Sequence, residues 1–402
     1  MSLYDEGIKK SDHDVVIVGA GITGLAMSLM AARAGLKVCL IDRRFPECKG
    51  AEFGVLSASQ KAWVSAIARP AQKVLRDLGV WDKLEKGACA YKEMQVEMHE
   101  GSILNFSCMD VGEENLGHIV NNFHIKEALW NGCLHEKNIQ MVCDEPEDWC
   151  IESGQLLTKK GQAIRAELLI GADGANSWAR KMAGIEIDED SKINDQAWVG
   201  VLRHEKAHRD IARQKFFTGG VVGLLPMANP RESVMVWSQG RGDHNGREIH
   251  DMSKSVEEKL RQFFTDMGSF EIESDLIVHG IQSQGAKCHH KGNVVLIGDA
   301  ATSVHPLAGQ GLNLGLRSVG ILAETFKQAQ RAHTSLADEY YLRRYSSKCE
   351  GFNALSRKFF VQCRLLSSAK IGYYFMGWGV SAVNHVGWLR RMFISHALYA
   401  DM

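Results

Sequence analysis

The chain has 402 residues, of which 45% are hydrophobic and 24% charged, and its formal net charge is −1. This length suffices for two domains with sizeable cores. The near-zero net charge argues against a nucleic-acid-binding protein, which normally carries a basic excess. The ten cysteines form no C-x-x-C pair, and the polar N-terminus has no apolar signal segment. We therefore expect reduced thiols and a cytoplasmic protein.

One cluster of metal-ligand residue types stands out in the chain. Cys288, His289 and His290 are consecutive. Adjacent residues rarely converge on one ion, and no second ligand pair follows them. We expect a solvated turn there and no metal site.

The N-terminal region has the pattern of a strand–helix–strand unit. Residues 14–19 (DVVIVG) form a short apolar run that ends in glycine, as a buried parallel strand does. A helix is predicted from Leu25 to Ala34, with Gly35 as its C-cap. Residues 36–42 (LKVCLID) then predict the second strand.

The rest of the chain alternates between strand and helix patterns, without an internal repeat. Apolar spacing predicts a helix over 72–84, and short buried strands over 166–172 and 292–298. Alternation and turn residues predict antiparallel sheet over 91–106 and 196–240. Helices are expected over 311–332 and 335–365.

A glycine motif connects the first predicted strand to the first helix. Gly19 permits a tight turn, Gly21 lets the backbone approach a pyrophosphate, and Gly24 allows close helix–strand packing. Asp42, at the end of the second strand, can accept hydrogen bonds from a ribose diol. Together these features predict a dinucleotide site, although this segment alone does not distinguish NAD from FAD.

Two later segments also combine a strand with a glycine-rich turn. The segment GADGANSWAR runs from Gly171 to Arg180, directly after an apolar strand. In the third segment, Gly298–Leu316, a strand ends at Asp299 and glycines open another helix. Such a helix start presents N–H donors to an electron-rich group.

In this order, the three segments resemble the single-component flavoprotein aromatic hydroxylases. The runs HPLAGQGLNLGL, LGVWDKL and QKFFTGGVVGLLP are more closely similar to the ubiquinone-biosynthesis hydroxylases. The resemblance spans about residues 14–400. It implies an α/β fold, in which a Rossmann-type FAD-binding domain is interrupted by a β-sheet substrate domain and followed by C-terminal helices.

The implied domain ranges follow from that fold. The FAD-binding domain is expected over 1–70, 100–180 and 285–345, the substrate domain over 71–99 and 181–284, and the C-terminal helical region over 346–402.

The resemblance also implies roles for individual residues. Gly19, Gly21, Gly24 and Asp42 would hold the ADP half of FAD, with Asp173 and Arg180 near the pyrophosphate. Asp299 would bind the ribityl or pyrophosphate part. Pro306 would lie near the reactive carbon of the flavin, with His305 as a candidate base. Gly309, Gly311, Leu312 and Asn313 would lie beside the pyrimidine edge.

The implied activity is hydroxylation of the ring of a prenylated phenol or quinol in ubiquinone biosynthesis. NAD(P)H would be the reductant and O2 the co-substrate, so the redox and oxygen-transfer chemistry would take place on the flavin. Two alternatives stay open: a flavin dehydrogenase or reductase on the same fold, and a non-catalytic paralogue in a quinone-synthesis assembly. A flavin halogenase is disfavoured, because the sequence has no W-x-W-x-I-P.

Five positions depart from the pattern of these hydroxylases. Thr302 replaces a histidine, Ser318 replaces an aspartate and Trp63 replaces an arginine. Asn121 replaces a glutamate, and Phe123 replaces a second arginine. Losing two arginines removes cations that would neutralise a pyrophosphate. Either compensating contacts exist, or the chain is retained for assembly rather than turnover.

The C-terminal stretch 371–389 contains no Asp, Glu, Lys or Arg and is followed by Arg390 and Arg391. Its length just reaches that of a membrane span, but four glycines, an asparagine and a histidine lower its apolar character. A helix packed on the protein, and an interfacial helix at the inner membrane through 371–391, are the leading interpretations.

Overall fold

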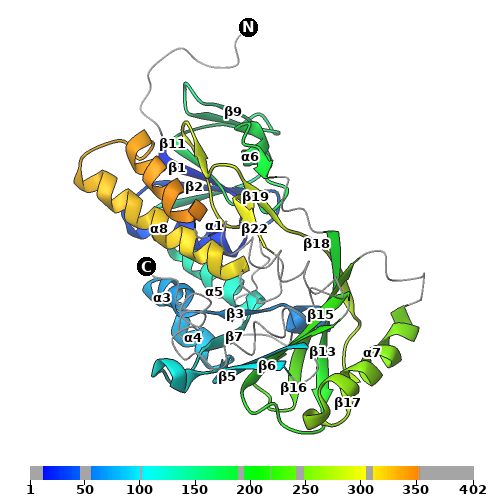
Figure 1. Cartoon of the computed structure of the whole chain (residues 1–402). Coiled ribbons are helices and arrows are strands. Elements are labelled where there is room, and N and C mark those ends of the chain that lie inside the picture. The colour runs from blue at the N-terminus through cyan, green and yellow to red at the C-terminus, as the bar shows by residue number, and fades with distance from the viewer. Residues whose placement is uncertain are drawn as a thin grey trace.

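The computed structural model describes residues 12–45, 56–99, 102–188, 194–217, 219–240, 249–304, 311–351 and 353. Two eight-stranded sheets dominate this part of the chain. Figure 1 shows the first sheet in the upper part of the molecule and the second at the lower right, with helices α1 (Ile22–Arg33) and α5 (Asn122–His135) between them. This mixed architecture confirms the predicted α/β fold class.

The first sheet is built on the predicted strand–helix–strand unit. Its parallel strands run in the order β21–β11–β1–β2–β8, with β20 pairing antiparallel at one edge and β10 and β9 extending β11. The bounds are β1 His13–Val18, β2 Val38–Asp42, β8 Ile139–Cys143, β9 Pro146–Cys150, β10 Gln155–Thr158, β11 Ala163–Gly171, β20 His290–Lys291 and β21 Val294–Leu296.

Both faces of this sheet are covered. Val15 and Ile17 pack into the cluster formed by the helices on one face, whereas Val16 and Val18 pack into a cluster on the other face. Successive side chains of a strand point to opposite faces, so burial on both explains the uninterrupted apolar runs. The helices of the first cluster include α3 (Arg69–Asp77), α4 (Trp81–Glu85) and α8 (Gly311–Arg331), and α6 (Trp178–Met182) packs on the opposite face.

The predicted helices are present with shifted ends. Helix α1 begins at Ile22, three residues before its expected start, because it follows Gly21 directly. It is followed by Gly35 in the left-handed region, as expected for a helix end. The single helix predicted over 72–84 is two helices, because Gly79, with φ of +64°, interrupts it. Residues 339–351 are helical, within the predicted 335–365.

The second sheet confirms the predicted antiparallel segments. The bounds are β5 Glu93–His99, β6 Ser102–Ser107, β13 Asn194–His204, β14 Ile211–Phe217, β15 Gly220–Pro226, β16 Glu232–Gly240, β17 Phe270–Ile272 and β18 Ile277–Gln282. Only the β14–β5 pair among these strands is parallel. Helix α7 (Ile249–Phe263) covers one face, where Phe263 packs with Phe217 and Trp237.

Smaller elements join the two large sheets. One three-stranded sheet contains β3 (Val64–Ile67), β7 (Gly117–Asn121) and β4 (Cys89–Tyr91), and another contains β12 (Ile187–Asp188), β19 (Gln284–Ala286) and β22 (Thr302–Ser303). Short helical turns are α2 Ala58–Ala62, η1 Cys108–Val111, η3 Thr265–Met267 and η4 Gly298–Ala300.

The sheets divide the chain differently from the predicted domain ranges at two places. Strand β6 pairs with β5, so the expected boundary between residues 99 and 100 separates two strands of one sheet. Helices α3 and α4 pack into the same core as β1, through Leu75 and Trp81 among others, although 71–99 was assigned to the substrate domain. Apart from its last residue, the β5–β6 hairpin lies within the predicted antiparallel segment 91–106, whereas the packing of α3 and α4 depends on tertiary contacts that local spacing does not show.

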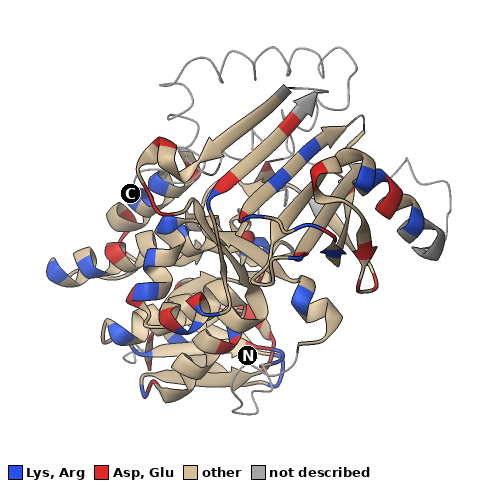
Figure 2. Cartoon of the chain, turned by 90° about the horizontal axis from the view of Figure 1, so that it is seen from below, with Lys and Arg blue, Asp and Glu red and all other residues tan. Residues whose placement is uncertain are grey.

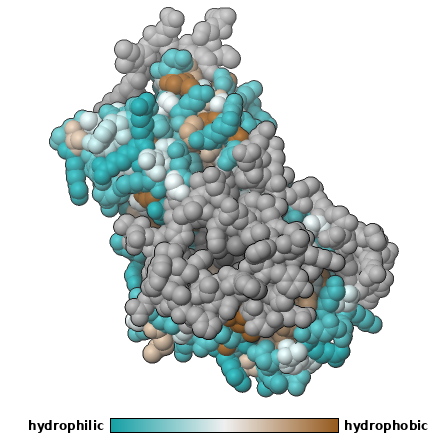
Figure 3. All heavy atoms as spheres, viewed as in Figure 1, coloured by the Kyte–Doolittle hydropathy of each residue, from teal (hydrophilic) through white to brown (hydrophobic). Residues whose placement is uncertain are grey.

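The surface carries both signs of charge. Figure 2 shows basic and acidic residues interspersed over the described elements, as the net charge of −1 implies. On the face in Figure 3 the described surface is mostly hydrophilic, with small hydrophobic patches. Among the helices that the structure describes, none is long and apolar enough to cross a membrane. The stretch 371–391 lies outside the described residues.

Candidate functional site

The first glycine loop is held by backbone contacts too close for a side chain. The N–H of Gly19 donates to Ile41 O at 2.8 Å, and Gly19 has φ of +109°. A Cβ on Gly19 would lie 2.5 Å from Ala172 O, and one on Gly24 would lie 1.9 Å from Gly19 O. Both distances are far below van der Waals contact, so glycine is required at both positions for packing.

Gly21 differs from Gly19 and Gly24, because its surroundings are open. It caps α1 in an extended conformation, with φ of −74° and ψ of 177°, which any residue can adopt. Within the part of the chain that the structure describes, a Cβ on Gly21 would meet nothing within 4 Å. The N-terminus of α1 therefore faces free space beside Gly21, where its N–H groups can bind an anion.

The carboxylate of Asp42 ties the end of β2 to the glycine loop. Its Oδ2 accepts from the Ala20 N–H at 2.6 Å, and its Oδ1 accepts from the Arg44 N–H at 2.9 Å. A carboxylate offers about four acceptor sites, so these bonds leave capacity for a ribose hydroxyl. Binding of ribose by Asp42 stays a prediction.

Asp173 of the second segment has one satisfied and one unsatisfied carboxylate oxygen. Its Oδ2 accepts from the Trp178 and Ala179 N–H groups, at 2.6 and 3.1 Å, at the start of α6. Its Oδ1 is buried and has no hydrogen-bond partner among the described residues. Buried polar atoms are normally paired, so this oxygen marks a position where a polar ligand group would be accepted.

Arg180 joins the second segment to the third. Its guanidinium is 3% exposed and donates to Ala175 O at 2.8 Å and to Ala300 O at 2.9 Å. Burial lowers the pKa of Arg180, and the nearby Asp173 partly opposes that effect. In this structure Arg180 therefore holds two backbone turns together, and a direct contact with the pyrophosphate stays a prediction.

The third segment packs on the first through Thr23. A Cβ on Gly298 would lie 2.7 Å from Thr23 Oγ1, and one on Gly315 would lie 2.6 Å from Thr23 Cγ2. Ser318 Oγ accepts from the Gly298 N–H at 3.2 Å and donates to Gly315 O at 2.6 Å. Sequence reasoning missed Thr23 and Gly315, because a side chain filling the space above a distant glycine leaves no local signal.

Asp299 lies in η4, at the start of the third segment. The residue is exposed to solvent, and desolvation raises the pKa of its carboxyl group. The site thus offers Asp299 to a ligand, although no contact in the structure tests which part of the cofactor it meets.

The start of α8 is tied to the end of β3. The Asn313 amide donates to Ala66 O at 2.7 Å and accepts from the Ala68 N–H at 2.9 Å. Leu312 packs against the helical core, and of the described residues Val304 alone, through Cγ2 at 3.9 Å, would meet a Cβ on Gly311. The side chain of Asn313 thus holds the end of β3 against the start of α8.

Three further candidate residues of this segment, His305, Pro306 and Gly309, lie outside the described residues.

The residues that depart from the hydroxylase pattern have contacts of their own. Thr302 Oγ1 accepts from Asn353 Nδ2 at 3.1 Å. The side chain of Asn121 accepts from the Phe123 N–H at 2.9 Å and donates to Gln60 O at 2.7 Å, which fixes α5 to α2. Trp63 is 46% exposed. These contacts explain Thr302 and Asn121 structurally, but they supply no cation in place of the missing arginines.

The comparisons agree with this geometry. The model of the FAD binding domain family matches residues 12–353. The chain is 28% identical over 393 residues to the ubiquinone hydroxylase UbiL of Rhodospirillum rubrum, covering 96% of this chain and 89% of that protein. It is 26% identical over 394 residues to the 3-demethoxyubiquinol 3-hydroxylase of Escherichia coli, covering 96% and 98%.

The fold recurs in a solved structure. The p-nitrophenol 4-monooxygenase PnpA of Pseudomonas putida superposes with a TM-score of 0.77 at 14% identity, over 98% of this chain and all (100%) of that one. The likeness extends across both large sheets, as the coverage requires.

FAD fits the residues present. The open position at Gly21, the Asp173 Oδ1 that has no partner among the described residues, and the exposed Asp299 come from the three segments. The second segment contacts the first at Gly19, and the third contacts it at Thr23. They offer backbone donors and carboxylate acceptors, which suit phosphates and hydroxyl groups respectively.

We predict that Gly21→Val leaves the fold intact and reduces FAD occupancy to roughly a tenth or less, because the new side chain fills the space a pyrophosphate needs. Flavin absorbance per chain after purification measures the occupancy. Gly87→Val is the matched control, since a Cβ on Gly87, an exposed residue, would also meet nothing within 4 Å among the described residues. Full flavin content in Gly21→Val would show that the cofactor lies elsewhere.

Proposed function

We propose a function for this chain, which belongs to the FAD binding domain family and has FAD as its cofactor. It is a monooxygenase that hydroxylates the ring of a prenylated phenol or quinol in ubiquinone biosynthesis. The observation that carries this proposal is similarity over almost the whole chain to two relatives named for hydroxylation of ubiquinone or its precursor, at 96% coverage each.

The chain's own residues would bind and orient the cofactor. FAD, when bound, supplies the redox chemistry by which NAD(P)H and O2 hydroxylate the ring. Gly21 and the N-terminus of α1 would receive the phosphates, Asp42 the adenosine ribose, and Asp173 and Asp299 polar groups further along the cofactor. The N–H groups at the start of α8, near Gly311, would face the flavin and favour negative charge on it.

The proposed reaction predicts that one atom of O2 appears in the product. Purified protein, reduced with NAD(P)H, is given isotopically labelled O2 and a short-tailed prenylphenol, and the product is analysed by mass spectrometry. We expect one labelled oxygen per hydroxylated ring. Oxidation of NAD(P)H with no label in the organic product would support a dehydrogenase instead, and no oxidation at all would support a non-catalytic protein.

Gly311→Val is predicted to keep FAD and lose most of the hydroxylation. A side chain at the start of α8 would push its N–H donors away from reduced flavin, where a helix dipole contributes about 0.3–1 kcal/mol when exposed and more when partly buried. Single-turnover label transfer measures the effect. Gly351→Val is the control, because Gly351 is a helical glycine with nothing within 4 Å. Equal label transfer in both variants would refute this role of Gly311.

The substrate of such an enzyme is a lipid, so we propose peripheral contact with the inner membrane, and an assembly of quinone-synthesis enzymes as a partner. The stretch 371–391 is the proposed contact, because its aromatic residues precede Arg390 and Arg391.

Deletion of residues 371–402 should release the protein from liposomes while flavin absorbance persists, since the nucleotide-binding segments are untouched. Flotation with anionic vesicles measures the binding. Unchanged flotation would exclude this contact, and loss of folding would favour a helix packed on the protein.

A further inference from the structure

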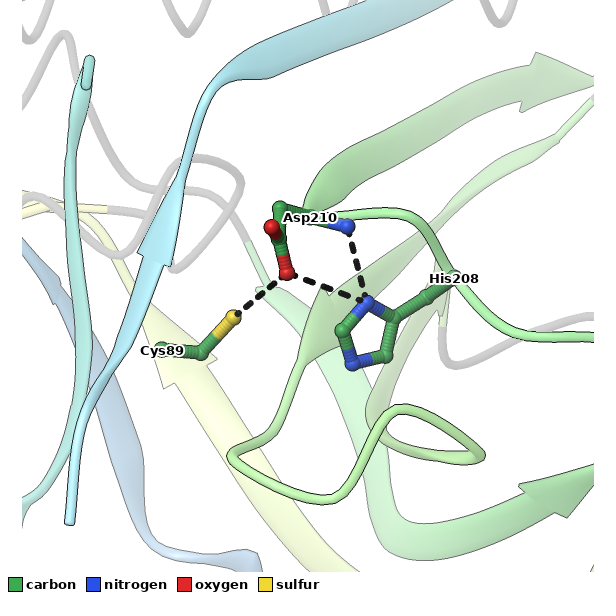
Figure 4. Close-up of side chains that lie close together, drawn as sticks. All are labelled: Cys89, His208 and Asp210. Atoms are coloured by element: carbon green, nitrogen blue, oxygen red, sulfur yellow. Dashed lines mark hydrogen bonds and ion pairs between the residues drawn. The ribbon is translucent and has the colours of Figure 1, made fainter. Parts of the chain in front are cut away.

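Three metal-ligand side chains meet outside the nucleotide site. Cys89 lies on β4, and His208 and Asp210 lie in the connection between β13 and β14. Figure 4 shows the Asp210 carboxylate between the Cys89 sulfur and the His208 ring. They form the one group of three or more such residues close enough to share an ion that the described part of the chain contains.

The distances approach those of a tetrahedral zinc site. Asp210 Oδ1 lies 3.8 Å from Cys89 Sγ and 3.8 Å from His208 Nδ1, and the three ligand atoms lie within 4.8 Å of one another. Zinc bonds of about 2.0–2.3 Å at tetrahedral angles separate neighbouring ligand atoms by about 3.3–3.6 Å. Shifts of a few tenths of an ångström to about 1 Å would therefore close the site around one ion.

The His208 ring is already in the tautomer that a metal requires. Its Nε2 lies 2.9 Å from Met227 O and 3.2 Å from Asn229 O, and carbonyl oxygens only accept, so Nε2 carries the hydrogen. Nδ1 consequently has a lone pair, which now accepts from the Asp210 N–H at 3.0 Å. A backbone carbonyl behind the ring is the usual support of a metal-bound histidine. Metal binding would replace the Asp210 N–H bond to Nδ1.

The charges around the cluster are compatible with a cation. Burial and the Asp210 carboxylate raise the pKa of the Cys89 thiol to about 12, so the thiol would lose its proton to solvent as the metal binds. Lys92 Nζ lies 4.0 Å from Asp210 Oδ2, but that side chain is 61% exposed and can turn into water. The Arg213 guanidinium, which also contacts this connection, is paired with Asp266 at 2.8 Å.

We propose that Cys89, His208 and Asp210 form a Zn²⁺ site with three protein ligands and an open position for water. Thiolate, imidazole and carboxylate are ligands that zinc accepts together. The ion would join β4, in the small sheet, to the second large sheet. This differs from the sequence-based expectation of no metal site, because the ligands are far apart in the chain and converge only through strand pairing.

Equilibrium dialysis of the full-length flavoprotein, first treated with a chelator and then exposed to Zn²⁺, tests the site. Metal content is measured by mass spectrometry and affinity by competition with a chromophoric chelator. We expect one tightly bound Zn²⁺ in the wild type and binding weaker by roughly tenfold or more in Cys89→Ser and Asp210→Asn, since even loss of a supporting contact costs 10–100-fold.

Cys108→Ser is the matched control, because Cys108 is buried in the same small core as Cys89 but belongs to no ligand group in the described residues. It should bind Zn²⁺ as the wild type does. Flavin absorbance reports folding, and Asp210→Asn, at a partly exposed position, decides the question if Cys89→Ser fails to fold. No stoichiometric zinc in the wild type, or equal zinc in all variants, would overturn the proposal.

Discussion

The close approach of backbones around the first glycine loop is the constraint on which the nucleotide site depends. Gly24 lets α1 lie against the turn at Gly19, where a Cβ would come within 1.9 Å of the Gly19 carbonyl oxygen. Thr23, one residue earlier, fills the space over Gly298 and Gly315. The third segment is thereby positioned on the first, and the second segment is positioned at Gly19, where a Cβ would lie 2.5 Å from Ala172 O. Packing at this density tolerates no added methyl group.

The polar residues of the site divide into those that the protein uses and those it leaves for a ligand. The side chains of Arg180, Asn313 and Ser318 form hydrogen bonds with backbone groups of neighbouring segments. By contrast, Asp173 Oδ1 has no partner among the residues that the structure describes, and Asp299 is exposed. Residues of the first kind fix the geometry before any ligand binds, which lowers the ordering cost of binding.

Sequence patterns predicted what is local and missed what depends on long-range contacts. The unit from β1 to β2, the three glycine segments and the antiparallel sheet follow from short-range spacing, because strands and turns have characteristic periods. The packing of α3 with α8 was not predicted, since it depends on tertiary contacts. Arg180 belongs to the second segment, and its bond to Ala300 O of the third segment could not be predicted without the fold.

In the proposed FAD site, Trp63 and Phe123 stand where the hydroxylase pattern has arginines. The N–H groups of α1 and the dipole of that helix would therefore carry more of the interaction with phosphates. A helix N-terminus contributes about 0.3–1 kcal/mol at the surface and up to about 2 kcal/mol when partly buried. Such a site depends on the exact path of the main chain. The backbone constraints at Gly19, Gly24 and Thr23 therefore matter more here than they would in a chain with both arginines.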